Sequence, residues 1–249
     1  MLRPHPTGCS GPKGNPISLA VSIQPSLAQV DSHAWNALVP ESDPFTRHEF
    51  LLALETSGSV GPGTGWQPCH VLAHDGNRLV AAVPLYFKSH SYGEYIFDWA
   101  WASAAERAGL AYYPKLVSAV PFTPVTGRRL LTGTQPLEGT LLDTLCAALE
   151  QTASELGASS YHLLFLTPEE HALLEDRSRL IGRITHQYHW KNNDYKSFED
   201  WLGHFRSRRR KEVLRERARA TELGATVSVL RGEELTQRHW EAIERYYLS

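Results

Sequence analysis

The chain has 249 residues, of which 42% are hydrophobic, 21% charged and 10% aromatic, with a formal net charge of −2 at pH 7. This is the composition of a soluble globular protein with one large domain or two smaller ones. No apolar run approaches the roughly 20 residues of a membrane helix, and the first residues lack the apolar stretch of a secretory signal, so the sequence excludes both classes.

Residues 1–17 are predicted to be a disordered leader or an extension of the start site. His186 and His189, the closest histidine pair, would point to opposite faces of a strand, so we expect no metal site. We also expect no tightly bound cofactor. The cysteines fit no ligand spacing and favour a reducing cytoplasm. They are Cys9, Cys69 and Cys146.

The first elements after the leader are a strand followed by two helices. β-Branched residues predict the strand at 17–25, and apolar residues at helical spacing predict helices at 26–39 and 43–58. Asp43 is the expected N-cap of the second helix, and Pro44 lies in its first turn.

A β-hairpin comes next. The Asp75-Gly76 dipeptide between two apolar runs predicts a tight turn joining two strands within 68–90. Further on, residues 92–97 are strand-like, and residues 100–108 predict a helix that ends at a glycine.

The middle of the chain reads strand, loop, long helix, strand. Residues 115–120 predict a strand, 137–158 the clearest helix, and 159–166 a strand buried on both faces. The helix should bury one side, formed by Leu141, Leu145, Ala148, Leu149 and Leu156. With the hairpin before it, this order predicts an α/β fold with a mixed sheet flanked by helices.

A domain boundary is expected near Thr185. Beyond it, Ser197 and Asp200 form a capping box that starts a basic helix near Phe198. A short strand at 225–230 and an amphipathic helix at 233–249 follow.

The basic helix holds eight Lys or Arg against two Glu between Arg206 and Arg219. Arg209 falls on the apolar arc of the helix, where a cation needs an anionic partner. Two interpretations stay open: a solvated helix whose glutamates pair along one face, or a phosphate site with Arg209 and Arg210 facing inward.

Residues 88–101 concentrate charged and aromatic side chains. A carboxylate beside aromatic rings at the mouth of a sheet is a candidate general base, because desolvation raises its pKa. Glu94 and Asp98 are the candidates, and a solvated or paired glutamate on a strand is the alternative.

Two prolines interrupt the apolar stretch at 114–131. Pro121 and Pro124 cannot donate to a sheet, so the strand loses its partner there. Thr123 and Thr126 then offer hydroxyls, Gly127 permits close approach, and Arg128 and Arg129 supply positive charge for an anionic ligand. The segment is the lip of a substrate cleft or an edge strand that runs into a surface turn.

Four segments, "KSHSYGEYIFDWAW", "YYPKLVSAVPFTPVTGRRLL", "QYHWKNNDYKSFEDWL" and "SRRRKEVLRERA", resemble a bacterial family of N-acyltransferases. Its members are described as Fem-like, or peptidoglycan biosynthesis/recognition, proteins of the GNAT superfamily. The resemblance runs from about Leu19 to the end of the chain. It implies a GNAT-like, mostly antiparallel sheet in a first domain at 18–185 and the beginning of a second GNAT-like domain at 186–249.

The resemblance also implies transfer of an acyl or aminoacyl group from acyl-CoA or aminoacyl-tRNA to an amine, for which a peptidoglycan precursor is the candidate acceptor. Two departures from the family pattern stand out: the loop Q/R-x-x-G-x-G/A before the long helix is absent, and family members continue past residue 249, so the chain is expected to be a fragment. The alternatives are a non-catalytic module that recognises a phosphorylated precursor, an inactive fragment, and an RNA-binding protein that uses the basic helix.

The candidate residues fall into three groups. The candidates for catalysis are Glu94 and Asp98. The candidates for substrate binding are Lys88, His90, Lys115, Thr123, Thr126 and Arg128. The candidates for phosphate binding are Arg206, Arg209, Arg210 and Lys211.

Overall fold

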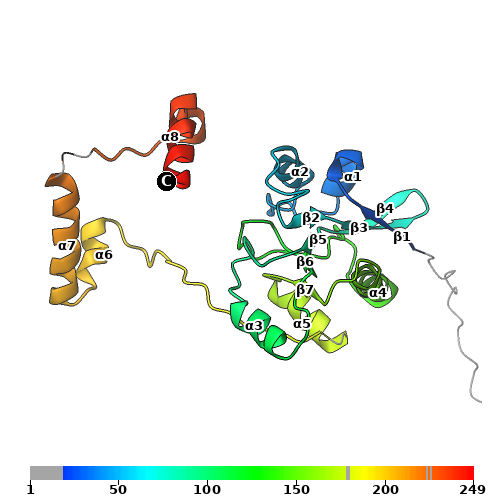
Figure 1. Cartoon of the computed structure of the whole chain (residues 1–249). Helices are drawn as coiled ribbons and strands as arrows, with labels where there is room; N and C mark the ends of the chain where they lie inside the picture. The colour runs from blue at the N-terminus through cyan, green and yellow to red at the C-terminus, as the bar shows by residue number, and fades with distance from the viewer. Residues whose placement is uncertain (1–18, 178–179, 223, 225) are drawn as a thin grey trace, which may run out of the picture. The chain divides into compact units, whose positions relative to one another are not determined.

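The computed structural model describes residues 19–177, 180–222, 224 and 226–249. The chain divides between Thr185 and His186 into a first and a second unit (Figure 1). That these units are two GNAT-like domains stays a prediction. The predicted leader and Cys9 lie outside the described residues.

The first unit holds seven strands and five α-helices in its described residues. The strands are β1 (Ala20–Gln24), β2 (Trp66–Pro68), β3 (His70–Asp75), β4 (Arg78–Val83), β5 (Tyr86–Lys88), β6 (Lys115–Ser118) and β7 (Tyr161–Leu163). The helices are α1 (Ser32–Asn36), α2 (His48–Thr56), α3 (Trp99–Arg107), α4 (Gly139–Glu155) and α5 (Pro168–Arg177), with a 3₁₀ turn η1 (Leu27–Gln29) before α1.

One long hairpin contributes two strands to each of the two sheets of this unit. β3 and β4 pair antiparallel across the Asp75-Gly76 turn, where Gly76 has a φ of 58°, as predicted. Near the open end of the hairpin, Cys69 N–H donates to Leu85 O at 2.9 Å, and the chains continue as β2 and β5. The sheet orders are β1-β3-β4 and β2-β5-β6-β7.

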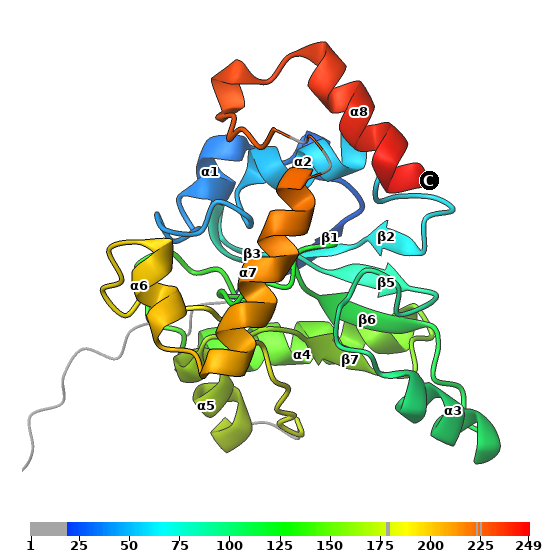
Figure 2. The same cartoon turned by 90° about the vertical axis from the view of Figure 1, so that its left-hand side faces the viewer.

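The second of these sheets contains a parallel strand pair. β6 and β7 run parallel, with Val117 opposite His162, and the other strand pairs of the described residues are antiparallel (Figure 2). α4 connects the parallel pair, because parallel neighbours need a crossover. The predicted mixed, mostly antiparallel α/β arrangement is confirmed.

Hydrophobic residues cover both faces of the hairpin. Val71 on β3 joins the core beneath α4 with Leu145, whereas its neighbour Leu72 joins the core beneath α1 and α2 with Trp35. Side chains alternate between the two faces because a strand has a period of two. Figure 1 shows α1 and α2 on one side of the strands and α4 on the other. Leu156, predicted on the buried side of α4, is 44% exposed.

The strand predicted at 92–97 is wrong. This segment is a loop in which Gly93, Tyr95 and Phe97 have φ angles of 81°, 59° and 50°. A strand needs negative φ throughout, so the alternation of side-chain types in this stretch does not produce one.

Two more predicted strands are shorter than expected. β6 ends at Ser118 and not at residue 120, because Pro121 has no N–H and Phe122 takes a left-handed φ of 61°. β7 covers Tyr161–Leu163 and is half-buried, so the prediction of a strand buried on both faces is also wrong.

The two N-terminal helices also differ from the prediction. The first is split into the turn η1 and the short α1. The second begins at His48, because the Asp43 carboxylate accepts from Phe45 N at 3.0 Å and Thr46 N at 3.3 Å and closes a separate turn before it.

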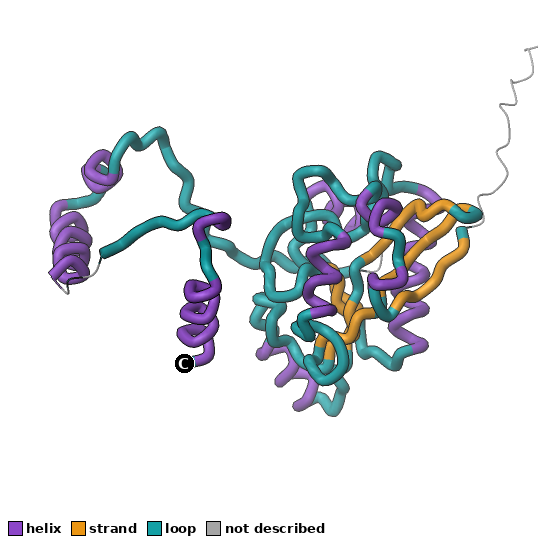
Figure 3. The backbone as a smooth tube through the Cα atoms, turned by 90° about the horizontal axis from the view of Figure 1, so that it is seen from above, coloured by secondary structure: helices purple, strands orange, loops and turns teal. Residues whose placement is uncertain are grey.

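The regular elements in the described part of the second unit are helices joined by loops, as the tube in Figure 3 shows. It contains α6 (Phe198–Gly203), α7 (Ser207–Glu222), the turn η2 (Gly232–Glu234) and α8 (Gln237–Leu248). Ser197 Oγ accepts from Asp200 N at 3.1 Å, which confirms one half of the predicted capping box, whereas the Asp200 carboxylate accepts from Lys196 N at 3.1 Å. The basic helix is two helices and not one, and residues 226–230 form no strand; Ala225, the first residue of that predicted strand, lies outside the described residues.

Candidate functional site

Lys115, the first residue of β6, lies in a group of buried ionisable side chains that we name the buried charge cluster: Lys88, Glu94, Asp98 and Lys115. Its Nζ is 2.8 Å from Glu94 Oε2 and 2.6 Å from Asp98 Oδ2, and it also donates to Ser91 Oγ at 3.0 Å. These three contacts occupy the three hydrogens of the ammonium. The fold therefore brings together four residues that the sequence predicts as separate candidates for catalysis or substrate binding.

Burial makes these contacts energetically important. Lys115 and Asp98 are 0% exposed and Glu94 is 2% exposed. A charge that leaves water loses several kcal/mol of solvation and regains it only through well-placed partners. With two lysines and two carboxylates, the cluster is formally balanced in charge.

The two carboxylates differ in acidity. Burial raises the pKa of Glu94 even though Lys115 opposes the shift. Burial also acts on Asp98, but the hydrogen bonds from Lys115 and Tyr112 outweigh it and lower the pKa of Asp98 to about 2. Glu94 is therefore the weaker acid of the pair and takes up a proton more readily than Asp98.

Each carboxylate also keeps one oxygen without a hydrogen bond. Glu94 Oε1 and Asp98 Oδ1 are buried, and neither has a hydrogen-bond partner in the described part of the chain. A buried acceptor without a partner is rare in folded proteins and calls for an explanation. For Glu94, the free oxygen is the atom that can accept a proton while Oε2 stays on Lys115.

Lys88 on β5 completes the cluster from the neighbouring strand. Its Nζ lies 3.6 Å from the ring centre of Trp66 and donates to Tyr92 O at 3.2 Å. Burial lowers the pKa of Lys88 to about 7, and Lys115 adds repulsion, whereas Glu94 acts in the opposite direction. Lys88 therefore loses its proton far more readily than an exposed lysine.

This acidity predicts a pH-dependent stability. The unfolded chain keeps the Lys88 proton up to about pH 10, whereas the folded chain releases it at about 7. Between these values the unfolded state binds more protons, so stability should rise with pH, by up to about 1.4 kcal/mol per pH unit. Urea unfolding of wild type and Lys88→Met across this range tests the prediction: the variant should lose the slope, and equal slopes would contradict it.

Three aromatic or hydroxyl side chains that the sequence analysis missed support the cluster. Tyr112 OH donates to Asp98 Oδ2 at 2.5 Å, and Ser91 Oγ lies 2.7 Å from Tyr113 OH. The two tyrosines directly precede Pro114 and Lys115, inside a segment that carries the family resemblance. Their place in this segment is the sequence signal that could have identified them.

The loop over Glu94 is held in an unusual conformation. Phe122 N–H, just after β6, donates to Gly93 O at 3.1 Å, and Trp66 Nε1 donates to Tyr92 O at 3.0 Å. Tyr95 in this loop and Phe122 both have positive φ angles, which cost about 1–3 kcal/mol each and concentrate at functional sites. His90, predicted to bind substrate, is half-buried beside the loop, and its Nδ1 accepts from Tyr92 N at 3.3 Å.

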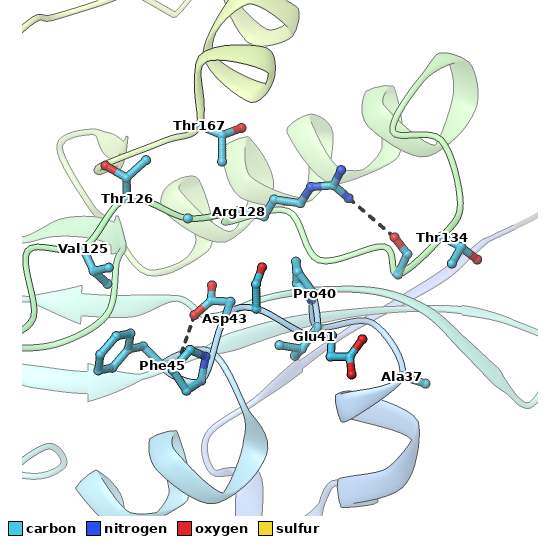
Figure 4. A pocket seen from close by; sticks show the side chains of 15 residues that line it. Ala37, Pro40, Glu41, Asp43, Phe45, Val125, Thr126, Arg128, Thr134 and Thr167 are labelled. Atoms are coloured by element: carbon cyan, nitrogen blue, oxygen red, sulfur yellow. Dashed lines mark hydrogen bonds between the residues drawn. The ribbon is translucent and has the colours of Figure 1, made fainter. Parts of the chain in front are cut away.

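A cavity of about 690 Å³ lies on another part of the first unit (Figure 4). One wall comes from the chain before α2 and the other from the segment after β6 and its neighbours. Two predicted substrate-binding residues, Thr126 and Arg128, line it. Thr123 does not line it and donates to Pro121 O at 3.2 Å. A volume of this size suits a small ligand.

Arg129 does not line the cavity, so the prediction that it supplies positive charge for an anionic ligand is wrong. It is fully buried and donates to Leu164 O at 2.9 Å and Val125 O at 2.6 Å. Its backbone N–H donates to Glu170 of α5. Arg129 therefore ties the segment after β6 to the segment after β7.

The predicted phosphate-binding cations of the second unit are exposed. Arg209 does not face inward as predicted but pairs with Glu212 at 2.7 Å, and Arg210 donates to Gly203 O at 3.0 Å, where it caps α6. Arg206 and Lys211 are also exposed. The pairing favours the solvated-helix interpretation for Arg209, and phosphate binding stays a prediction.

Neither a metal cluster nor a membrane-spanning helix occurs in the described residues. No three His, Cys, Asp or Glu side chains are placed there to hold an ion. None of the described helices has the length and apolarity to cross a bilayer. Cys69 and Cys146 are free thiols.

Comparisons with known proteins relate these features to a family. A FemAB-like family model, described as peptidoglycan biosynthesis/recognition, matches residues 26–249. No match was found among curated proteins. Among solved structures, a ribosomal-protein-alanine N-acetyltransferase from Brucella melitensis biovar Abortus 2308 is similar, with 12% identity and a TM-score of 0.42 over 70% of this chain and 100% of that chain. The family match includes both the buried charge cluster and the cavity.

Proposed function

Because the chain belongs to the FemAB-like family of peptidoglycan biosynthesis and recognition proteins, we propose that it transfers an acyl or aminoacyl group to the amine of a peptidoglycan precursor. The observation that carries the proposal is Glu94. Its carboxylate has a raised pKa, one oxygen on Lys115 and one oxygen free. A raised pKa and an oxygen free to accept a proton are properties that a general base needs.

The reaction needs one proton acceptor and one electrophile. The acceptor amine arrives as an ammonium, and Glu94 takes its proton. The free amine attacks the carbonyl carbon of a thioester or an ester, the C–N bond forms, and the C–S or C–O bond breaks. The leaving thiolate or ribose oxygen then takes up a proton, so no covalent enzyme intermediate is required.

The arrangement around β6 supports this assignment. Pairing of β6 and β7 is interrupted beyond Ser118, where Pro121 and the left-handed Phe122 follow, and the loop that carries Glu94 is hydrogen-bonded to Phe122. The end of a parallel strand pair in an α/β sheet is where ligands commonly bind. We propose that the acyl donor, either acyl-CoA or aminoacyl-tRNA, enters there.

Access to Glu94 requires the loop at 91–98 to move, because the Glu94 side chain has no exposed surface. Loops that close over a site and exclude water strengthen the electrostatic interactions inside it. Tyr95 and Phe97 hold left-handed conformations, and their side chains are exposed on this loop. A loop with such backbone strain is suited to switch between a closed conformation, which buries Glu94, and an open one, which exposes it.

The same burial favours a second candidate function from another class. If Glu94 and Lys115 form only a structural ion pair, the chain is a recognition module that binds a cell-wall precursor without transferring anything to it. The two functions differ in the loop's role: the enzyme needs Glu94 to be reached, and the recognition module does not.

Mass spectrometry separates the two candidates. The purified chain is incubated with acetyl-CoA or alanyl-tRNA and with a lysine-containing stem peptide of peptidoglycan. The enzyme proposal expects the mass of one acyl or alanyl group on the peptide amine with one of the two donors. Binding of the peptide without transfer from either donor would support the recognition module instead.

A further inference from the structure

Opposite charges line the two walls of the 690 Å³ cavity. Arg128 lies on one wall, and Glu41 and Asp43 lie on the facing segment (Figure 4). Arg128 makes one long hydrogen bond, of 3.5 Å, to Gly133 O. In the described part of the chain, no ion pair joins it to either carboxylate. The guanidinium of Arg128 is thus not paired with the carboxylates on the facing wall.

Asp43 is a fixed part of the anionic wall. Its Oδ1 accepts from the backbone N–H groups of Phe45 and Thr46, and its Oδ2 is buried without a hydrogen-bond partner in the described residues. A Cβ on Gly127 would lie only 2.8 Å from Oδ2, so the opposite wall approaches this carboxylate closely. Glu41 is exposed, so its side chain can adapt to a ligand.

The remaining lining is polar but uncharged, or apolar. Hydroxyl groups come from Ser42, Thr126, Thr134 and Thr167, and apolar surface comes from Val39, Phe45 and Val125. Arg129 interacts electrostatically with Asp43, so Arg128 and Glu41 are the exposed charges of opposite sign that the cavity offers to a ligand. Its lining complements a small ligand that carries one negative and one positive charge.

We propose that this cavity binds a short peptide or amino acid through a free carboxylate on Arg128 and a free ammonium on Glu41. Arg128 offers the planar donor pair that matches a carboxylate, and Glu41 offers an exposed carboxylate that can pair with an ammonium. The inference rests on the proposed function, to which it adds the chemical class of the acceptor: a molecule with one ammonium held at Glu41 and a second, different amine that reacts at Glu94. It assigns the cavity to recognition of the acceptor and the buried charge cluster to proton transfer.

Isothermal titration of the full chain with three dipeptide forms tests the proposal. The probes are alanyl-alanine, its N-acetyl derivative and its C-terminal amide. The free dipeptide should bind about tenfold more tightly than either capped form, because each cap removes one charge-assisted contact. Millimolar probe concentrations are needed for so small a ligand.

Two variants link each charge to its residue. Arg128→Gln should abolish the preference for the free acid over the amide but retain the preference for the free amine. Glu41→Gln should do the opposite. Arg107→Gln and Glu106→Gln are the matched controls: both residues are exposed on α3, outside the cavity, and their changes in charge are the same. These controls should bind all three probes as wild type does.

Each remaining outcome has a definite meaning. No binding of the free dipeptide, equal binding of all three probes, or an identical effect of both variants would overturn the cavity assignment. Acyl transfer by the chain together with any of these results leaves the enzyme proposal intact. Selective dipeptide binding without acyl transfer supports the cavity assignment and counts against the enzyme.

Discussion

Lys115→Met should lower the free energy of unfolding by about 3–5 kcal/mol, because it leaves two buried carboxylates without their shared cation. Lys115 Nζ contacts both Glu94 and Asp98, and all three side chains are fully buried. Methionine keeps the length of the stem, so the loss reflects the missing charge and not a cavity. Urea unfolding with a constant m-value measures it.

The loss should also depend on pH. Without Lys115, the pKa values of Glu94 and Asp98 in the folded state rise, so the folded chain binds more protons than the unfolded chain above the ordinary carboxyl pKa of about 4. Stability of the variant relative to wild type should therefore fall as the pH rises from about 5 to 8.

Lys88→Met is the matched control for the charge. It also removes a buried ammonium, but Lys88 donates to a backbone carbonyl and lies over the Trp66 ring, with no carboxylate in direct contact. Its unfolding free energy at neutral pH should change much less than that of Lys115→Met. Equal losses in the two variants, or a loss below about 1 kcal/mol for Lys115→Met, would contradict the role of the ion pairs.

Glu94→Gln should reduce the rate of acyl transfer by about 10²–10⁴-fold, the usual contribution of a positioned general base. Glutamine can still accept from Lys115 Nζ through its amide oxygen, and Asp98 continues to balance that charge. The folded structure should therefore survive the change. The rate is measured from the acylated peptide at saturating donor and acceptor.

A pH profile separates a base from a merely structural carboxylate. A general base must be ionised, so kcat/KM of wild type should fall as the pH drops through the raised pKa of Glu94, above its ordinary 4.5. Glu94→Gln should lack this acid limb, and Glu106→Gln, an exposed control on α3, should retain it. A profile of the same shape in Glu94→Gln would show that Glu94 is not the base.

Local patterns predict much of this fold. The Asp75-Gly76 turn and α4 follow from turn chemistry and helical periodicity, and both are confirmed by the structure. The strand expected at 92–97 is absent because its left-handed residues depend on contacts with Phe122 and Trp66, which are distant in sequence. Alternation of side-chain types carries no information about such contacts.

The candidate site is only partly visible in the sequence. Glu94, Asp98 and Lys115 are each marked by residue chemistry or resemblance, but the ion pairs join Lys115 to loop residues that precede it by 21 and 17 positions. The sequence does not single out Glu41, because an acidic residue next to a proline is common on protein surfaces. It predicts Asp43 only as a helix N-cap. Only the folded chain places both across a cavity from Arg128.

The most direct test of the central proposal is acyl transfer itself, measured in parallel for wild type and Glu94→Gln. Both proteins are incubated with isotope-labelled acetyl-CoA or alanyl-tRNA and the lysine-containing stem peptide, and labelled peptide is followed by mass spectrometry. We expect the label on the peptide amine with wild type and about 10²–10⁴-fold slower labelling with Glu94→Gln. No labelling from either donor by a folded wild-type chain that binds the peptide, or equal rates for both proteins, would contradict the proposal.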